Sequence, residues 1–335
     1  MPAGDLTLDT ARLDAEYAAL NERCGLVDRS ERGKLALSGA DTKTFLAGQV
    51  TNDTEALEPG TGCYAAFLTH KGKMLGDLRI LDVLPGDDQG IGETAGEELL
   101  LDTERVALQA LFDMIRRFKI GYELQLHKRT VERGLLSLIG PEAASVAGAE
   151  ALPAEEHANV VVEIDGIAVL AARTDAGVDL LCDSAATERL IEALCGRGAR
   201  AVSEQAAEIV RVEHGRPRYG IDMDDGTIPQ EAGLNARAVS FTKGCYVGQE
   251  TVARLYYKGK PNRLLRGLRL SEPSTPGAEL RLGEKPVGYL SSSVLSPTFG
   301  PIGLGLVRRE AEIGASVAVG DGADDATVVE LPFRV

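Results

Sequence analysis

Apolar residues recur along this chain with two different periods, which distinguish the expected helices from the expected strands. The first helix is predicted over residues 11–24 and is closed by Gly25 at its C-terminal end. Its apolar face carries residues at spacings of four, three and four: Leu13, Tyr17, Leu20 and Cys24. Other helices are predicted at residues 41–46, 104–118 and 185–195, and after the N-cap Ser203 as far as about residue 214.

Short apolar runs, several of them alternating, predict the strands. They lie at residues 34–37, 98–102, 122–126, 134–139 and 177–183, with two more within residues 63–84 that join at residues 70–73. A hairpin is predicted within residues 160–173, because Asp165-Gly166 separates two apolar alternations. Strand pairs alternate with single helices twice. We therefore expect an α+β fold with two subdomains rather than a doubly wound parallel sheet.

The pattern changes after Arg254. The polar run at residues 256–263 is typical of a linker, and the apolar stretches beyond it are short and separated by Gly, Pro and Ser. We therefore predict that residues 1–257 hold the two α+β subdomains. Residues 258–335 are expected to form a small antiparallel β-barrel or sandwich.

Composition excludes several classes of function. The chain has 335 residues, with 36 basic and 51 acidic side chains and a net charge of -15, which argues against a general nucleic-acid-binding surface. No apolar run approaches the ~20 residues of a membrane span, and we see no signal peptide, so a cytoplasmic location is expected. Five cysteines without CxxC spacing indicate neither a disulfide framework nor a zinc site. The glycines of residues 85–97, an expected loop, form no dinucleotide fingerprint.

One stretch, FTKGCYVGQETVAR at residues 241–254, combines a cysteine, a chemically reactive residue, with two glycines that permit unusual backbone angles. A helical pattern begins near Gln249, so Cys245 is expected at a loop-to-helix junction, where amide N–H groups and the helix dipole favour an anion. With Lys243 nearby, this setting would lower the pKa of the Cys245 thiol and favour the thiolate. The alternative is that Cys245 is a small buried packing residue.

The segment from Lys243 to Glu250, K-G-C-Y-x-G-Q-E, resembles the signature of the YgfZ family. These are folate-binding relatives of the glycine-cleavage T-protein that support iron–sulfur cluster enzymes, including those that thiolate tRNA. Residues 211–223, 229–234, 287–297 and 302–307 also resemble the T-protein superfamily. The resemblance implies two interleaved subdomains of antiparallel sheets and helices, followed by a C-terminal barrel.

The same resemblance implies the site residues. Glu213, in R-x-E-x-G, would hold the pterin ring, because a carboxylate accepts two parallel N–H bonds from an aminopyrimidine edge. His214 beside it is read as a solvated helix residue. Weaker folate contacts are Asn52, Asp77 and Arg237. Around the candidate functional thiol of Cys245, the motif adds Lys243, Gly244, Tyr246, Gln249 and Glu250 as binding residues.

Three functions remain open. The preferred hypothesis is a weakly catalytic or non-catalytic protein that binds tetrahydrofolate or a derivative and acts with iron–sulfur assembly or client proteins. The alternative is an aminomethyltransferase of glycine cleavage. Against it, Gly76 stands where the T-protein pattern G-G-x-x-D-D-L has the first of two acids, and the KGCYVGQE motif is foreign to T-proteins. The third is an adaptor that uses folate structurally. One cysteine cannot hold a cluster alone, because clusters normally need four protein ligands.

Overall fold

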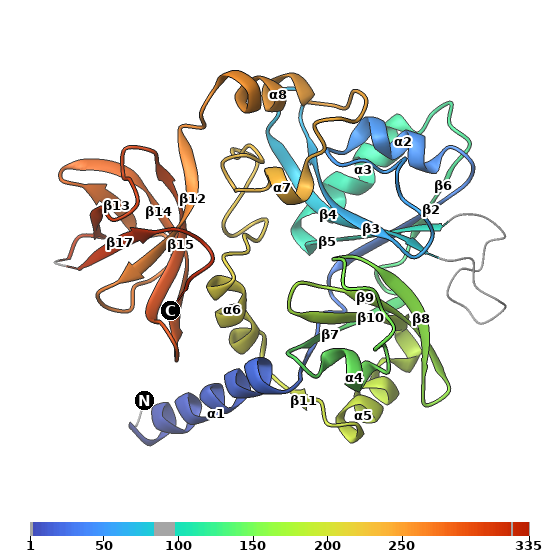
Figure 1. Ribbon diagram of the computed structural model, residues 1–335, viewed down its shortest axis with the longest axis horizontal. Coiled ribbons are helices and arrows are strands. Elements are labelled where there is room, and N and C mark those ends of the chain that lie inside the picture. The colour runs from blue at the N-terminus through green and yellow to red at the C-terminus, as the bar shows by residue number, and fades with distance from the viewer. Residues whose placement is uncertain (1–2, 84–97, 323, 335) are drawn as a thin grey trace.

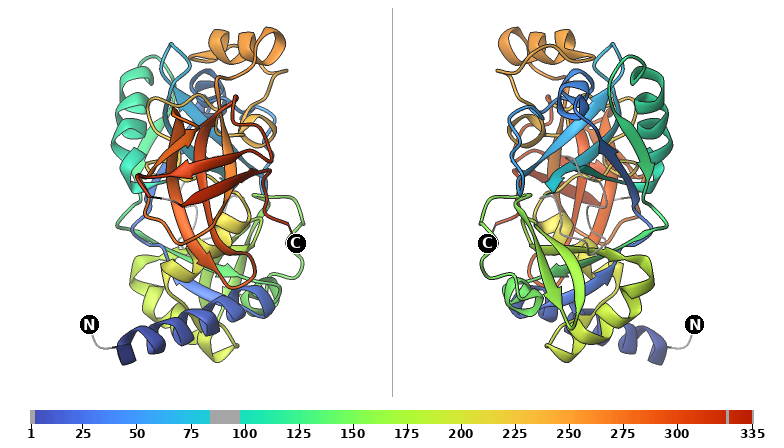
Figure 2. Two further views of the ribbon diagram at one scale, coloured as in Figure 1. Left: turned by 90° about the vertical axis from the view of Figure 1, so that its left-hand side faces the viewer. Right: turned by 90° about the vertical axis from the view of Figure 1, so that its right-hand side faces the viewer.

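The computed structural model describes residues 3–83, 98–322 and 324–334, so the loop predicted at residues 85–97 lies outside the described part. Three lobes surround helix α6 (Glu204–Glu213): two α+β lobes and a barrel (Figure 1). Helix α8 (Gln249–Lys258) lies at one end of the molecule and α1 (Ala3–Glu22) at the other, as both side views show (Figure 2). No helix of the described residues is long and apolar enough to cross a membrane.

The first lobe is a five-stranded antiparallel sheet of order β3-β4-β5-β2-β6. Its strands are β2 (Gly33–Ser38), β3 (Gly62–Leu68), β4 (Met74–Val83), β5 (Glu98–Thr103) and β6 (Gln125–Lys128). Helices α2 (Thr42–Gln49) and α3 (Leu108–Phe118), the latter preceded by the 3-10 turn η1 (Arg105–Ala107), cover one face. Apolar side chains of both helices, such as Phe45 and Leu111, share one core with the sheet.

The second lobe is a six-stranded sheet of order β11-β1-β7-β10-β9-β8. Its strands are β1 (Gly25–Asp28), β7 (Arg133–Ile139), β8 (Asn159–Ile164), β9 (Ile167–Arg173), β10 (Gly177–Asp183) and β11 (Arg200–Ala201). Helices α4 (Ala143–Ala147) and α5 (Thr187–Gly196), with η2 (Ser184–Ala186), pack on it. Because β1 precedes the whole five-stranded sheet in the chain, the two lobes are interleaved. The α+β fold expected from the sequence is confirmed.

The two sheets pack against each other through the faces that their helices leave free. Leu81 and Leu100 of the five-stranded sheet share a buried cluster with Leu135, Leu170 and Leu181 of the six-stranded sheet. The central strands are thus buried on both faces, and for this reason they read as continuous apolar runs. Charged residues in these strands must therefore find partners within the protein.

The third lobe is a closed antiparallel barrel of order β12-β15-β14-β13-β16-β17. Its strands are β12 (Arg263–Leu270), β13 (Glu279–Leu282), β14 (Lys285–Ser296), β15 (Gly300–Arg308), β16 (Ser316–Val319) and β17 (Asp325–Val329). Short α7 (Asn235–Ala238) and α8 connect the barrel to the rest of the chain. A barrel, one of the two architectures expected for this region, is confirmed.

Local signals of turns and caps are confirmed. Asp165 and Gly166 have φ values of 51° and 75°, as a two-residue hairpin with the right-handed strand twist requires. The hydroxyl of Ser203 accepts a hydrogen bond of 3.2 Å from the backbone N–H of Ala206, so Ser203 caps α6.

Several predicted boundaries are wrong. Helix α1 ends at Glu22, and Gly25 begins β1; a Cβ there would lie 2.5 Å from Leu20, so close packing requires this glycine. The strand predicted at residues 122–126 is β6, at Gln125–Lys128, because a turn follows Gly121. The helix predicted at residues 104–118 is split into η1 and α3, and Val106 is 66% exposed. Residues 256–258, predicted as linker, complete α8.

Candidate functional site

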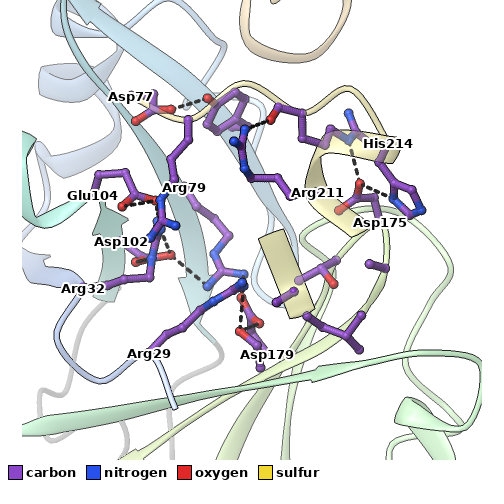
Figure 3. A pocket seen from close by; sticks show the side chains of 18 of the residues that line it. Arg29, Arg32, Asp77, Arg79, Asp102, Glu104, Asp175, Asp179, Arg211 and His214 are labelled. Atoms are coloured by element: carbon purple, nitrogen blue, oxygen red, sulfur yellow. Dashed lines mark hydrogen bonds and ion pairs between the residues drawn. The ribbon is translucent and has the colours of Figure 1, made fainter. Parts of the chain in front are cut away.

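A cavity of about 240 Å³ lies where the two sheets meet α6 and the segment that follows it (Figure 3). We call it the inner cavity. Its charged lining comprises Arg29, Arg32, Arg79, Arg211, Arg216, Arg218, Arg237, Asp77, Asp102, Glu104, Asp175, Asp179 and Glu204, joined by Tyr64 and His214. Of the residues expected from the sequence to form a folate site, Asp77 and Arg237 are among these lining residues.

Asp77 comes from the middle of β4 and is 7% exposed. Its Oδ2 accepts a short hydrogen bond from the hydroxyl of Tyr64 on the neighbouring strand β3. Burial raises the pKa of Asp77 to about 6, aided by the nearby charge of Glu104, against the lowering effects of Tyr64 and Arg32. A carboxyl group with this pKa can hold or release a proton near neutral pH, which is the property required of a general acid or base.

Gly76 lies beside Asp77 but faces the other side of the sheet. A Cβ at Gly76 would lie 2.6 Å from the ring of Phe67 and 2.7 Å from the Cβ of Ala107, inside the core beneath α3. Successive residues of a strand point to opposite faces. The position where the T-protein pattern has its first acid therefore does not face the inner cavity in this protein. Its replacement by glycine leaves the acid that does face the cavity in place.

Arg237, in α7, lies over the ring of Tyr64. Its guanidinium carbon lies 5.2 Å from the centroid of the Tyr64 ring, and its Nη2 pairs with Glu156. The Arg237 Nε is buried and has no hydrogen-bond partner in the described structure. A buried donor without a partner is rare, because it costs free energy to remove it from water. Arg237 thus presents a donor that a ligand in the cavity can use.

Much of the inner cavity wall is a closed ring of ion pairs and hydrogen bonds. In order around the ring, the residues are Arg32, Asp102, Arg79, Asp179, Ser137, Arg29, Glu204, Arg218 and Glu104, which returns to Arg32. The ring joins both sheets, α6 and the segment after it. Attraction to Arg32 and Arg79 outweighs burial and lowers the pKa of Asp102, so this carboxylate stays ionised, in contrast to Asp77.

A second group of charged residues, Asp175, His214 and Arg216, lines the cavity beside the C-terminal end of α6. Asp175 accepts a hydrogen bond of 2.6 Å from the Nε of Arg216 and pairs with the Nδ1 of His214 at 3.6 Å. Burial would raise the pKa of Asp175, but these two partners hold it well below its ordinary value. His214, read from the sequence as a solvated residue, lines the cavity. His214 follows α6 as its C-cap and its side chain is 42% exposed, so it is solvent-exposed as expected and lines the open side of the cavity.

Glu213 does not line the inner cavity. It is 6% exposed, and its carboxylate accepts hydrogen bonds from the hydroxyl of Tyr17 in α1, at 2.9 Å, and from Ser296 of β14, at 2.5 Å. Glu213 thus links α1, α6 and the barrel. A contact between Glu213 and a pterin stays a prediction, and this carboxylate would have to leave those partners to make it.

Asn52 supports the inner cavity from outside its lining. Its side-chain amide donates to the backbone carbonyls of Tyr64, at 2.8 Å, and Arg237, at 3.3 Å. The Asn52 Oδ1 accepts from the N–H of Asp53 at 2.9 Å. Asn52 therefore fixes the backbone at Tyr64, which donates to Asp77, and at Arg237, which lies over the Tyr64 ring. A direct contact with folate stays a prediction for Asn52.

Lys243 is directed away from the surface. Its Nζ donates to the carbonyls of Ala47, Val50 and Asn52 at 2.6, 2.8 and 2.8 Å, which accounts for all three N–H groups of an ammonium. Burial lowers the pKa of Lys243 to about 8. The Lys243 ammonium thus caps carbonyl groups at the C-terminal end of α2 and just beyond it. The expected role of Lys243 as the charge that activates the Cys245 thiol finds no support in this arrangement.

Cys245 is exposed, which excludes the alternative that it is a buried packing residue. The helix expected to begin near Gln249 is confirmed, since α8 begins there after the N-cap Gly248, with φ of 86°, and Cys245 lies in the loop before it. Gly248 is required there because a Cβ would also lie 2.6 Å from the carbonyl oxygen of Thr69.

The other motif residues have separate positions, none of them in the inner cavity lining. Gly244 is exposed, whereas Tyr246 is buried in a core beneath the loop, and burial raises its pKa to about 12. Gln249 and Glu250 form the first turn of α8. The motif thus builds a surface loop with an exposed thiol, apart from the cavity around Asp77.

Sequence reasoning missed most of the inner cavity, although one signal was present. Arg79, Asp102 and Asp179 stand within apolar stretches of the strands β4, β5 and β10. Charged residues in strands buried on both faces must be paired, so three of them predict a buried polar site. Which strands lie side by side could not be read from this signal.

Two family models together match most of this chain, and curated relatives match it over nearly its whole length. The GCVT N-terminal domain matches residues 8–243, and the glycine cleavage T-protein C-terminal barrel domain matches residues 263–334. The aminomethyltransferase of Synechococcus sp. strain RCC307 is 30% identical, with 96% of this chain and 90% of that protein covered. The aminomethyltransferase of Rubrobacter xylanophilus is 27% identical, with 98% and 88% covered.

A solved structure agrees in fold. The crystal structure of glycine cleavage system aminomethyltransferase T from Bartonella henselae matches this protein with a TM-score of 0.83 at 25% identity, covering 96% of this chain and 89% of that chain. The order of two interleaved sheets and a closing barrel is thus a shared architecture. Since the N-terminal family domain alone spans more than half of its residues, this chain belongs to the GCVT family of glycine-cleavage T-protein relatives.

Proposed function

We propose that this protein is a tetrahydrofolate-dependent aminomethyltransferase that works in the inner cavity around Asp77. The observation that carries the proposal is the orientation of β4. Asp77 faces the cavity with its pKa raised to about 6, and the missing acid at Gly76 belongs to the opposite face. This removes the main sequence argument against the transferase and reverses the order of the two hypotheses. The relatives named aminomethyltransferase support the same assignment.

The residues of the inner cavity suit a reduced folate. Its aminopyrimidine edge and reacting amines are N–H donors, which the carboxylate of Asp77 can accept. The ring of Tyr64 offers a flat apolar face, and the free Nε of Arg237 offers a donor for the carbonyl groups of the ligand. Tetrahydrofolate, when bound, supplies the two amines that take up the one-carbon unit as a methylene bridge, with release of ammonia and of the donor thiol.

The protein contributes position and proton control. Tyr64 and Asn52 hold the wall beside Asp77 in place, so its carboxyl group meets the reacting amine in one orientation. With a pKa near 6, Asp77 can accept a proton from that amine and return it to the departing ammonia or thiol. The arginines of the ring lower the pKa values of Asp102 and Glu204 against the effect of burial, whereas the pKa of Asp77 is raised, and Asp77 is the acid suited to proton transfer.

The test is single-turnover transfer from an aminomethyl-lipoyl carrier protein to tetrahydrofolate, followed by methylenetetrahydrofolate and ammonia in equal amounts. Asp77→Asn should lower the rate by about a hundredfold or more, in the range of a lost general acid–base group. Asp113→Asn, on the exposed side of α3, is the matched control and should keep the full rate. A wild-type protein that binds folate but releases neither product would rule the transferase out.

A second candidate function has its own observation, the exposed thiol of Cys245 in a loop apart from the inner cavity. We propose as the alternative that this thiol supports iron–sulfur cluster enzymes, including tRNA-thiolating ones, by contact with an assembly or client protein. In a strain lacking the protein, Cys245→Ala should then fail to restore cluster-enzyme activity while Cys195→Ala, at another exposed thiol, succeeds. Full restoration by Cys245→Ala would remove this candidate.

A further inference from the structure

Helix α8 lies at one extremity of the molecule, beyond the three lobes, in the front view and in both side views (Figures 1 and 2). Only a small part of its surface is covered, since Val252 is the buried residue of this fully described helix. The hairpin tip at residues 69–73 packs against its first turn, where a Cβ at Gly72 would lie 2.8 Å from the Cβ of Thr251. A flat surface can therefore reach α8 before it meets the rest of the protein.

The C-terminal half of α8 and the residues just after it are positively charged. Arg254, Lys258 and Lys260 are exposed, and the hairpin tip adds exposed Lys71. None of these four cations forms an ion pair or a side-chain hydrogen bond with any residue that the structure describes. The acid of α8, Glu250, lies in its first turn. In a chain with a net charge of -15, this end of the molecule is locally positive.

Three aromatic rings lie among these cations. Tyr256 and Tyr257 are 51% and 66% exposed. The ring of Tyr256 stacks on that of Phe241, with centroids 3.7 Å apart, and the Tyr257 ring meets Tyr256 edge-on at 5.0 Å. The stack holds the tyrosines in place at the surface without covering them. Exposed aromatic groups surrounded by charged residues are typical of an interaction site.

The arrangement of these side chains along α8 indicates the shape of the partner. At about 100° per residue, Arg254, Tyr257 and Lys258 fall on the face opposite Val252. A helix face that combines basic and aromatic side chains is typical of helices that lie on a membrane surface. There, tyrosine rings occupy the level of the lipid headgroups, while lysine and arginine are attracted to anionic lipids.

Two other anionic or acidic partners fit this surface less well. Single-stranded nucleic acid binds where bases stack on free ring faces along a basic groove, but Phe241 and Tyr256 cover one another and the cations lie on a protruding helix. A second copy of this chain, joined by a two-fold contact through α8, would bring the same unpaired cations together.

We propose that α8 and the residues as far as Lys260 form a docking surface for a membrane rich in anionic phospholipid. The four cations contact the headgroup phosphates, and Tyr256 and Tyr257 enter the headgroup region. The proposal concerns contact with the surface of a bilayer and not a span across it. It is independent of the proposed transferase, because these residues do not line the inner cavity.

The experiment is cosedimentation of the full chain with vesicles of phosphatidylcholine alone and of phosphatidylcholine mixed three to one with phosphatidylglycerol. The wild type should bind the mixed vesicles at least about a hundredfold more strongly, and the binding should weaken between about 50 and 500 mM salt. Each cation at an anionic surface contributes about fivefold, so Lys258→Gln/Lys260→Gln should lower the partition coefficient about twentyfold. Tyr257→Ser should also weaken binding but leave its salt dependence unchanged.

The control variant, Arg117→Gln/Arg189→Gln, removes two exposed arginines on α3 and α5 and should bind as the wild type does. An equal loss in this control would overturn the assignment to α8. Equal binding of the wild type to both kinds of vesicle, or binding to neither, would overturn the proposal. Tighter binding to a single-stranded oligonucleotide than to mixed vesicles, lost in the double lysine variant, would overturn it in favour of nucleic acid.

A measurement on the wild type alone decides if the double lysine variant fails to fold. Mixed vesicles should slow the hydrogen exchange of backbone amides at residues 253–260, and phosphatidylcholine vesicles should not. Protection confined to other segments would overturn the proposal.

Discussion

Gly76 and Asp77 are neighbours on β4 that face opposite sides of the five-stranded sheet, Gly76 toward Phe67 and Ala107 in the core and Asp77 toward the inner cavity. An acid at position 76 would therefore point into packed apolar side chains. A second carboxylate cannot be added to the cavity from this position. The acids of the cavity are Asp77, Asp175 and the carboxylates of the ion-pair ring.

Gly76→Asp should lower the free energy of unfolding by more than about 3 kcal/mol, because the carboxylate is buried without a partner and overlaps the Phe67 ring. Gly76→Ala adds the Cβ alone and should cost about 1–3 kcal/mol. Urea denaturation followed by circular dichroism measures both variants. A Gly76→Asp protein as stable as the wild type would show that this position can face solvent or the cavity.

Asp77→Asn should make the protein more stable above pH 6 while it lowers the transfer rate by about a hundredfold or more. The pKa of Asp77 is 3.8 in an ordinary setting and about 6 in the fold, so the folded state loses stability as pH rises from about 4 to above 6. Removing the buried negative charge should restore about 2–3 kcal/mol at pH 7.5. Urea denaturation of wild type and variant at pH 7.5 and 4 measures this, and the difference should vanish at pH 4. An equal difference at both values would exclude titration of Asp77 as the cause.

Lys243→Gln should destabilise the protein without slowing the alkylation of Cys245. The ammonium of Lys243 is bound to three carbonyls at the end of α2, and a buried group of this kind is expected to contribute about 2–3 kcal/mol. Urea denaturation measures the loss, and iodoacetamide labelling with peptide mapping measures the thiol. Lys243→Arg serves as the control that keeps the charge. A large drop in alkylation rate with unchanged stability would return Lys243 to the role that the sequence suggested.

His157→Asn should make the protein less sensitive to acid. Burial, with the charges of Arg79 and Arg237, lowers the pKa of His157 to about 3 from 6.5, so the neutral ring is the folded form. The unfolded chain takes up the proton first, and stability falls by about 1.36 kcal/mol for each pH unit below 6.5. Asparagine tolerates the φ of 74° at this position. Unfolding at pH 7 and pH 4.5 should show a smaller loss for the variant, whereas His70→Asn, at an exposed hairpin tip, should behave as the wild type.

The features that the sequence predicted correctly are those whose causes are local. Asp165-Gly166 makes its hairpin from its own backbone angles, and Ser203 caps a helix three residues away. The Lys243 argument failed because the carbonyls that bind its ammonium are 191 to 196 residues upstream in the chain. No periodicity links residues so far apart in sequence.

The candidate site shows the same difference between features with local causes and features that depend on contacts distant in sequence. Asp77 was found through a motif within its own strand, whereas the hydrogen bond from Tyr64 and the approach of Arg237 depend on how β3, β4 and α7 are packed. The family pattern also assigned an acid to position 76 without regard to the face of the strand. The alternation of strand side chains, together with the burial of Phe67, would have been needed to see that this position lies in the core.

The position of β1 between β11 and β7 in the six-stranded sheet has a consequence for the order of folding during synthesis. The pairing partners of β1 are β7, which ends at Ile139, and β11, which ends at Ala201, so β1 must wait unpaired while more than 100 residues that follow it are made. The five-stranded sheet lies within residues 33–128 and can form earlier from contiguous chain. Nascent chains stalled near residue 150 should therefore resist protease across the described residues 33–83 and 98–128 and be cut at residues 25–28; protection of β1 at that length would contradict this order.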